Sequence, residues 1–184
     1  MAKVIVGMTV SVDGFVADAR GNAGRLYPDL AELRGTEYMR GAIAETGAVI
    51  MGRRTFQMAD ADSYVGSYEF QVPIFVVTHR APRVVPKQDE RLTFTFVTEG
   101  LESAVTRAKA AAGEKAVSVV GGVSVMRQIL EAGLVDELHV DVMPVFLGGG
   151  LRAFEGAGLE RVGLEKIGVV EVGARTSMSF RVKR

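Results

Sequence analysis

Short apolar runs alternate along the chain with segments in which apolar residues recur at helical spacing. This alternation is typical of α/β proteins, in which helices cover a mostly parallel sheet. The apolar runs predict strands at Lys3–Val10, Ala48–Met51, Pro73–Thr78, Leu92–Val97, Ala116–Val120 and Val135–Val145. The periodic segments predict helices at Asp29–Glu45, Leu101–Ala112 and Val123–Glu131, with a short helix beginning at Arg53.

The end of the chain has a different pattern, because apolar and polar residues alternate from about residue 161 to residue 183. A period of two predicts strands with one solvated face, and two such strands in succession predict an antiparallel hairpin. The runs in the middle of the chain are almost continuously apolar, which is typical of parallel strands covered on both faces. We therefore expect an α/β fold with a mixed, mostly parallel central sheet, flanking helices and an antiparallel C-terminal hairpin.

The 184 residues suit a single domain, which we place at residues 1–184. The chain carries 22 Lys and Arg residues and 22 Asp and Glu residues, so its formal net charge is zero. A neutral chain lacks the general electrostatic footprint of a nucleic-acid-binding protein. Any site for an anion must therefore be local, and we expect no nucleic-acid partner.

The chain has no cysteine and only two histidines, which excludes a disulfide framework and argues against a metal site. No stretch reaches the roughly 18 apolar residues that a membrane-spanning helix needs. The first residues, MAKVIVGMTVSVDGFVADA, hold one cation and an Asp-Gly interruption. This composition favours a β-rich strand over a signal peptide. We expect a cytoplasmic protein with no metal and no membrane partner.

Glycine and polar residues follow three of the predicted strands at the point where each strand ends. In open α/β sheets, ligands bind beyond the carboxyl ends of the strands, and a helix that begins there offers free amides to an anion. Each segment alone fits an ordinary turn or a solvated charge, but together they predict a site for an extended phosphorylated ligand such as a dinucleotide. Neither a Rossmann G-x-G-x-x-G pattern nor a P-loop is present. The segments are Gly52-Arg53-Arg54-Thr55, Thr78-His79-Arg80 and Gly121-Gly122-Val123-Ser124.

The motifs VIMGRRTF, IFVVTHR and VSVVGGVSVMRQIL follow one another in this order. Together they resemble the dihydrofolate reductase superfamily across roughly residues 3 to 142. The segments SVDGFVA and PVFLGGG-LRAFEG are similar to the C-terminal reductase domains of riboflavin biosynthesis and their stand-alone relatives. The resemblance implies a dihydrofolate-reductase-like fold and an NADPH-dependent reductase. The zinc deaminase domain of the bifunctional riboflavin enzymes needs cysteine ligands, so this chain corresponds at most to the reductase half.

The resemblance also implies which residues hold NADPH. The segment at 52–55 would contact the phosphates, the segment at 78–80 the adenosine end with its 2′-phosphate, and the segment at 121–125 the pyrophosphate. Three arginines among these residues favour NADPH over NADH. The implied cofactor-binding residues are Val16, Ala17, Gly52, Arg53, Arg54, Thr55, Thr78, His79, Arg80, Gly121, Gly122, Val123, Ser124 and Val125.

A carbon that accepts hydride needs a proton on the neighbouring atom, from a side chain or through water. Asp13 and Glu37 are the candidate catalytic residues, and Asp141 is a further polar candidate. As alternatives, Asp13 fits a turn aspartate before glycine, and Glu37 fits a solvent-facing helical carboxylate. The candidate substrate-binding residues are Thr9, Ser11, Gly148 and Gly149.

We expect an NADPH-dependent reductase of a small heteroaromatic or imine-like metabolite. A more specific version of this expectation is a 5-amino-6-(5-phosphoribosylamino)uracil reductase, in which Arg20 or Arg25 would bind the substrate phosphate. Two alternatives stay open: a dihydrofolate or pterin reductase, and a non-catalytic NADPH-binding module. Folate reduction fits less well, because Thr36 stands where those reductases carry an acid and the chain has no tryptophan. The resemblance also implies a homodimer.

Overall fold

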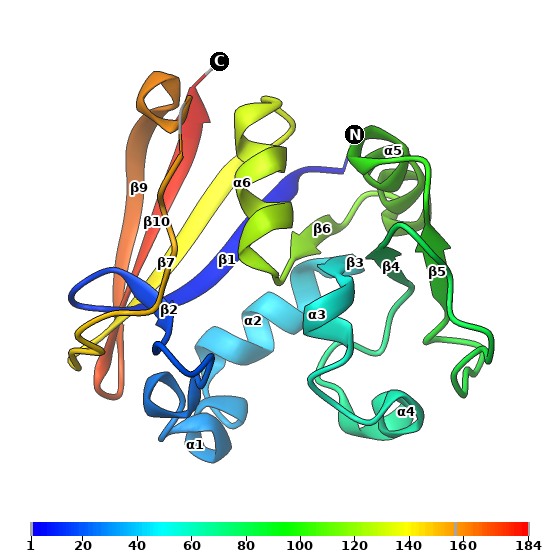
Figure 1. Cartoon of the computed structure of the whole chain (residues 1–184), viewed down its shortest axis with the longest axis horizontal. Helices are drawn as coiled ribbons and strands as arrows, with labels where there is room; N and C mark the ends of the chain where they lie inside the picture. The colour runs from blue at the N-terminus through cyan, green and yellow to red at the C-terminus, as the bar shows by residue number, and fades with distance from the viewer. Residues whose placement is uncertain (1, 157, 184) are drawn as a thin grey trace.

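The computed structural model describes residues 2–156 and 158–183. Within these residues, a mixed sheet of eight strands crosses the molecule, and helices cover both of its faces (Figure 1). The first six strands in spatial order run parallel to one another, the seventh runs antiparallel to its neighbours, and the eighth runs in the direction of the first six. The order is β5 (Phe94–Val97), β4 (Ile74–Val77), β3 (Thr46–Gly52), β6 (Ala116–Val119), β1 (Val4–Ser11), β7 (Glu137–Met143), β10 (Arg175–Lys183) and β9 (Gly163–Val172). The predicted fold class and the antiparallel C-terminal hairpin are confirmed.

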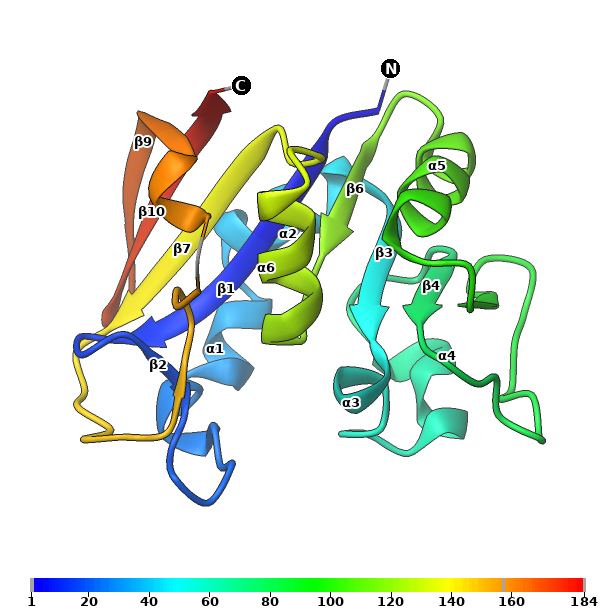
Figure 2. The same cartoon turned by 45° about the horizontal axis from the view of Figure 1, so that its top comes forward.

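The central strands are apolar throughout because both faces of the sheet are buried. In β3, Ala48 and Ile50 belong to the hydrophobic cluster on one face, and Val49 and Met51 to the cluster on the other. The first face is covered by α5 (Leu101–Ala112) and α6 (Val123–Glu131), as Figure 2 shows. The opposite face carries α1 (Leu30–Arg34), α2 (Glu37–Glu45), α3 (Arg53–Phe56) and α4 (Tyr64–Ser67). Short 3₁₀ turns lie at Gly24–Leu26, Ala61–Ser63 and Leu159–Arg161.

The structure begins and ends α5 and α6 at the predicted residues, but the single helix predicted at Asp29–Glu45 is wrong. The segment forms two helices, because α1 ends at Arg34, Gly35 caps it, and Thr36 leaves the helical conformation. The Thr36 hydroxyl oxygen accepts a hydrogen bond from the Met39 amide at 3.2 Å, which caps the start of α2. The break turns α2 across the sheet independently of α1.

A second, two-stranded sheet was not predicted. It pairs β2 (Phe15–Ala17) with β8 (Leu151–Arg152) in antiparallel fashion. The strands are too short for a periodic pattern, and their pairing joins segments that lie far apart in the sequence. The Arg152 guanidinium stacks over the Phe15 ring at 4.6 Å from its centroid. This small sheet fastens the N-terminal loop to the segment that follows β7.

No helix within the described residues is both long and apolar enough to cross a membrane.

Candidate active site

The carboxyl ends of β4, β3 and β6 meet at one edge of the sheet, because the three strands are parallel neighbours. Gly52 lies opposite Val77 in the register of β3 and β4, so Thr78 follows directly beside it. The Gly52 amide donates a hydrogen bond to the Gly121 carbonyl at 2.8 Å, just beyond the end of β6. The three segments that the sequence singles out therefore lie along one rim.

Glycine is required where these segments touch. Gly121 has a φ of +133°, and a Cβ there would lie 3.0 Å from Thr55 Oγ1. A Cβ on Gly52 would lie 3.2 Å from the Gly122 amide nitrogen. The peptide bond between Gly121 and Gly122 is cis. The start of α3 and the start of α6 can approach this closely only because no side chain separates them.

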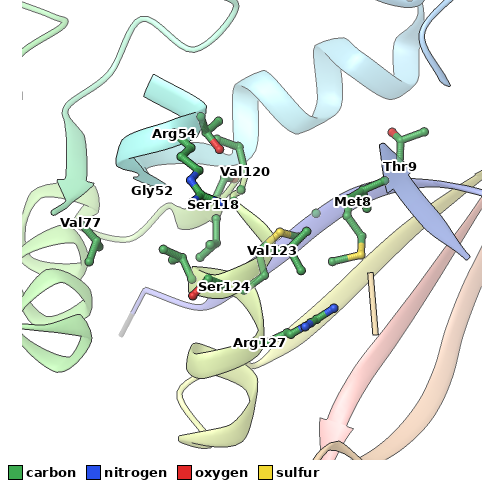
Figure 3. Close-up of a pocket in the computed structure, with 18 of the residues that line it drawn as sticks. Met8, Thr9, Gly52, Arg54, Val77, Ser118, Val120, Val123, Ser124 and Arg127 are labelled. Carbon is green, nitrogen blue, oxygen red and sulfur yellow. The ribbon is translucent and has the colours of Figure 1, made fainter. Parts of the chain in front are cut away.

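A cleft of about 2020 Å³ opens along this rim and continues across the sheet toward β1 and β7. This volume is about twice the upper end of ordinary small-molecule pockets, so the cleft has room for a cofactor and a second ligand. Figure 3 shows Met8 and Thr9 of β1, Gly52 at the end of β3 and Ser124 of α6 around this space. The predicted cofactor residues that line the cleft are Val16, Ala17, Gly52, Arg53, Arg54, Thr55, Thr78, His79, Gly121, Gly122, Val123, Ser124 and Val125.

Arg80 is the exception among the predicted cofactor residues. Its side chain is exposed and lies outside the set of described residues that line the cleft. The Arg80 backbone closes a local turn, in which the Thr78 hydroxyl donates to the Arg80 carbonyl at 2.9 Å. The turn directs His79 to the cleft and leaves Arg80 on the surface.

The rim carries positive charge. Arg53 and Arg54 line the cleft with exposed side chains, and neither forms an ion pair or a side-chain hydrogen bond with another described residue. The first-turn amides of α6 face the same region and have no partner within the helix. Unpaired guanidinium groups beside free amides are suited to phosphate oxygens.

The other end of the cleft holds a buried polar network centred on Arg175, which is 1% exposed. Arg175 donates to both carboxylate oxygens of Asp29, at 3.0 Å from Nε and 2.6 Å from Nη2. Its Nη1 donates to Asp141 Oδ2 at 3.0 Å and to Thr9 Oγ1 at 3.4 Å. Thr9, Asp141 and Arg175 line the cleft, so the network forms its floor at this end.

Tyr38 of α2 completes the network. Its hydroxyl donates to Asp141 Oδ1 at 2.9 Å and accepts from the Ser177 hydroxyl at 3.0 Å. Burial, followed by the negative charge of Asp141, raises the pKa of Tyr38 to about 12. Tyr38 therefore keeps its proton at neutral pH and acts as a hydrogen-bond donor to Asp141.

Comparison with known proteins agrees with this geometry. The family model of the RibD C-terminal domain matches residues 2–178.

The chain belongs to the RibD C-terminal domain family.

The uncharacterised protein YwjB of Bacillus subtilis is 27% identical over 152 residues, which cover 83% of this chain and 82% of YwjB. A putative riboflavin biosynthesis protein from Shewanella sp. PV-4 superposes with a TM-score of 0.74 at 23% identity, over 100% of both chains.

Two further solved structures share the fold. The Thermotoga maritima deaminase and 5-amino-6-(5-phosphoribosylamino)uracil reductase superposes with a TM-score of 0.68 at 16% identity. That match covers 99% of this chain and 57% of the Thermotoga protein. The dihydrofolate reductase of Enterococcus faecalis in complex with NADP(H) gives 0.62 at 15% identity, over 99% and 97% of the two chains. The resemblance of the sequence motifs to the RibD C-terminal domain family is confirmed, and the chain shares its fold with the dihydrofolate reductase.

This RibD C-terminal domain places its predicted catalytic carboxylates away from the cleft lining. Glu37 is exposed, and its neighbour Tyr38 occupies the inward position of the first turn of α2. Asp13 accepts the amides of Leu147 at 3.1 Å and Gly148 at 2.7 Å. A hydrogen bond from Ser11, with these two amides, lowers the pKa of Asp13 to about 2. Asp13 is therefore ionised and links two loops through these hydrogen bonds. A carboxylate that has already lost its proton is not suited to act as a proton donor.

Of the predicted substrate-binding residues, the structure brings Thr9 to the cleft. Ser11 is buried, and its hydroxyl accepts the Phe15 amide at 3.0 Å. Gly148 and Gly149 belong to the loop that Asp13 holds, outside the described residues of the cleft lining. Arg175, Asp29 and Tyr38 were not predicted as site residues, and Asp141 was only one polar candidate among several.

Proposed function

We propose that this chain is an NADPH-dependent reductase that transfers hydride to a small heteroaromatic or imine-like metabolite. The observation that carries the proposal is the rim where Gly52, Thr55 and Gly121 meet, because a Cβ on Gly121 would fill the space beside Thr55. Such a rim fits the pyrophosphate of a dinucleotide, which needs close approach to backbone amides. Membership of a reductase family and the shared fold of an NADP(H)-bound reductase support it.

In this proposal the phosphates lie between Arg53, Arg54 and the start of α6, and the nicotinamide lies toward Val16 and Thr9. When bound, NADPH supplies the hydride, and the protein supplies position and charge. Arg53 and Arg54 provide the unpaired cations at the rim, so they replace Arg80, which lies outside the described lining residues, as the groups that recognise the 2′-phosphate. Tyr38 and Asp141 are the hydrogen-bonding groups at the substrate end.

The pterin alternative has less support. It would place a carboxylate from the first helical segment in the cleft, whereas Glu37 is exposed. The phosphoribosyl substrate needs a further cation, but Arg20 lies outside the described lining residues, and Arg25 donates to the Phe146 carbonyl at 2.9 Å.

Thermal unfolding with NADPH, NADH or ATP tests the cofactor part of the proposal. NADPH at about a hundred times its dissociation constant should stabilise the protein by about 2.7 kcal/mol, and NADH and ATP should shift Tm less. Equal shifts, or none with any of the three, would contradict it. NADPH oxidation with candidate pterins, flavin precursors and quinones then separates a reductase from a non-catalytic NADPH-binding module.

We also propose that two copies of the chain form a homodimer by pairing through β9. This strand is an edge of the sheet, and within the described residues it pairs only with β10. Its side chains Leu164, Ile167, Val169 and Val170 are between 41% and 52% exposed. Long apolar edges are prone to pair with another chain. Light scattering should give a dimer mass at micromolar concentration, and a monomer mass would remove this part of the proposal.

A further inference from the structure

The two ends of the cleft differ in charge. Arg175 contributes one positive charge to the floor, whereas Asp29 and Asp141 contribute two negative charges, so the network is anionic. The remaining guanidinium groups at the lining away from the rim are already engaged. Arg34 lies 4.0 Å from Glu69, and Arg127 donates to the backbone carbonyls of residues 152 and 153. An anionic group at this end would find little to neutralise it.

Asp141 also has unused acceptor capacity. Its Oδ1 accepts from Tyr38 and its Oδ2 from Arg175, and each carboxylate oxygen can accept two hydrogen bonds. One acceptor position therefore remains on each oxygen, and the carboxylate lines the cleft. Two acceptors on one carboxylate match a pair of parallel N–H donors, such as a ring N–H beside an exocyclic amino group.

We propose that Asp141 anchors the substrate and selects a nitrogen-rich ring with paired N–H donors and no phosphate or carboxylate at that end. Arg175 and Tyr38 are positioning residues in this proposal, because each donates a hydrogen bond to one oxygen of the Asp141 carboxylate and so fixes its orientation. Open space at Gly7, where an added Cβ would have no heavy atom within 4 Å, leaves room for a flat ring against β1. The proposal rests on the proposed function, which assigns the cationic rim to NADPH and leaves this end to the substrate.

Asp29 provides a matched control. Both Asp29 and Asp141 are carboxylates bound to the Arg175 guanidinium, but only Asp141 belongs to the cleft lining. Asp29→Asn and Asp141→Asn therefore each remove one negative charge that pairs with the Arg175 guanidinium. A purely structural role of the network would make the two substitutions equivalent for ligand binding.

The test is calorimetric binding of 2,4-diaminopyrimidine, whose protonated ring supplies the N–H beside an amino group, and of orotate to the whole chain, with and without NADPH. The wild type should bind the diaminopyrimidine at least about tenfold more tightly than orotate, an anionic pyrimidine of similar size. Asp141→Asn should weaken diaminopyrimidine binding about ten- to a hundredfold, as expected for a charge-assisted hydrogen bond. Asp29→Asn should change it by less than about threefold.

Three results would overturn the proposal: no diaminopyrimidine binding to the wild type, orotate binding as tightly, or equal losses in the two variants. If Asp141→Asn does not fold, the wild-type preference between the two pyrimidines still decides. The arms without NADPH separate this proposal from the cofactor proposal. If the protein binds the diaminopyrimidine but does not bind NADPH, only the cofactor proposal is contradicted.

Discussion

The two ends of the cleft are built in opposite ways. The rim at the ends of β3, β4 and β6 presents glycines, amides and exposed guanidinium groups without protein partners. The floor beneath α2 is buried, and Arg175 there donates to three different side chains. Unpaired groups at the rim are ready to bind a ligand, whereas the floor is held rigid before a ligand arrives. In the proposed function, the rim contributes affinity for a charged cofactor, and the floor orients a substrate that carries no phosphate or carboxylate at that end.

The largest expected effect comes from removing the centre of the floor. Arg175→Met would leave Asp29 and Asp141 without their cation in a buried place, and breaking a buried pair in this way costs about 3–5 kcal/mol. Urea unfolding should show this loss of free energy. Arg53→Met, which removes an exposed arginine without a protein partner, should change the free energy of unfolding by less than about 0.5 kcal/mol. Similar losses in both variants would remove the distinction between floor and rim.

A side chain at the centre of the rim should have the next largest effect. Gly121→Ala places a methyl group 3.0 Å from Thr55 Oγ1 at a φ of +133°, so the rim must open and NADPH binding should fall at least about tenfold. Gly133→Ala, at the other end of α6, is a control with a positive φ and nothing within 4 Å of the added methyl group. If both variants bind NADPH equally well, close backbone approach is not what the rim provides.

The charge of the rim can be tested through cofactor preference. Arg53→Ala should weaken NADPH binding about ten- to a hundredfold and NADH binding much less, because only NADPH carries the 2′-phosphate. Arg80→Ala should leave both affinities nearly unchanged, since its side chain lies outside the cleft lining. Competition titrations with the two cofactors measure both variants. An equal loss of both cofactors in Arg53→Ala would contradict the assignment.

The smallest expected effect is a change in the free energy of unfolding at acid pH, caused by protonation of Asp29 in the floor. Hydrogen bonds from Arg175 lower the pKa of Asp29 below its ordinary value of 3.8. A lowered pKa stabilises the fold above the unfolded value, and this contribution is lost as pH falls through the folded value. The difference in unfolding free energy between the wild type and Asp29→Asn should therefore shrink from about pH 6 to about pH 3. A constant difference would mean that the Arg175 contact does not depend on the Asp29 charge.

The rim could be predicted from the sequence, because each of its segments is local. The motifs VIMGRRTF and VVGGVSV each place glycine directly after an apolar strand, and parallel pairing then brings the strand ends together. Arg80 was predicted on the same basis, but one turn at Thr78 directs its side chain outward, and a linear pattern does not record such a turn.

The floor could not be predicted in this way. Thr9, Asp29, Tyr38, Asp141 and Arg175 come from β1, the start of α1, α2, β7 and β10, and no spacing in the sequence relates them. The break at Thr36 also matters, because one continuous helix across residues 29–45 would turn Tyr38 differently. An arginine in the alternating C-terminal hairpin is indistinguishable from a solvated one until the topology is known. Arg181, in the same strand, is in fact exposed.

Hydrogen exchange of the whole chain with and without NADPH tests the central claim most directly, because it locates the bound cofactor on the backbone. Peptides that cover Gly52–Phe56 and Gly121–Met126 should gain protection when NADPH is added, and peptides of β9 should not. Protection confined to other segments, or no change anywhere at saturating NADPH, would contradict the account of the strand-end rim as the cofactor site.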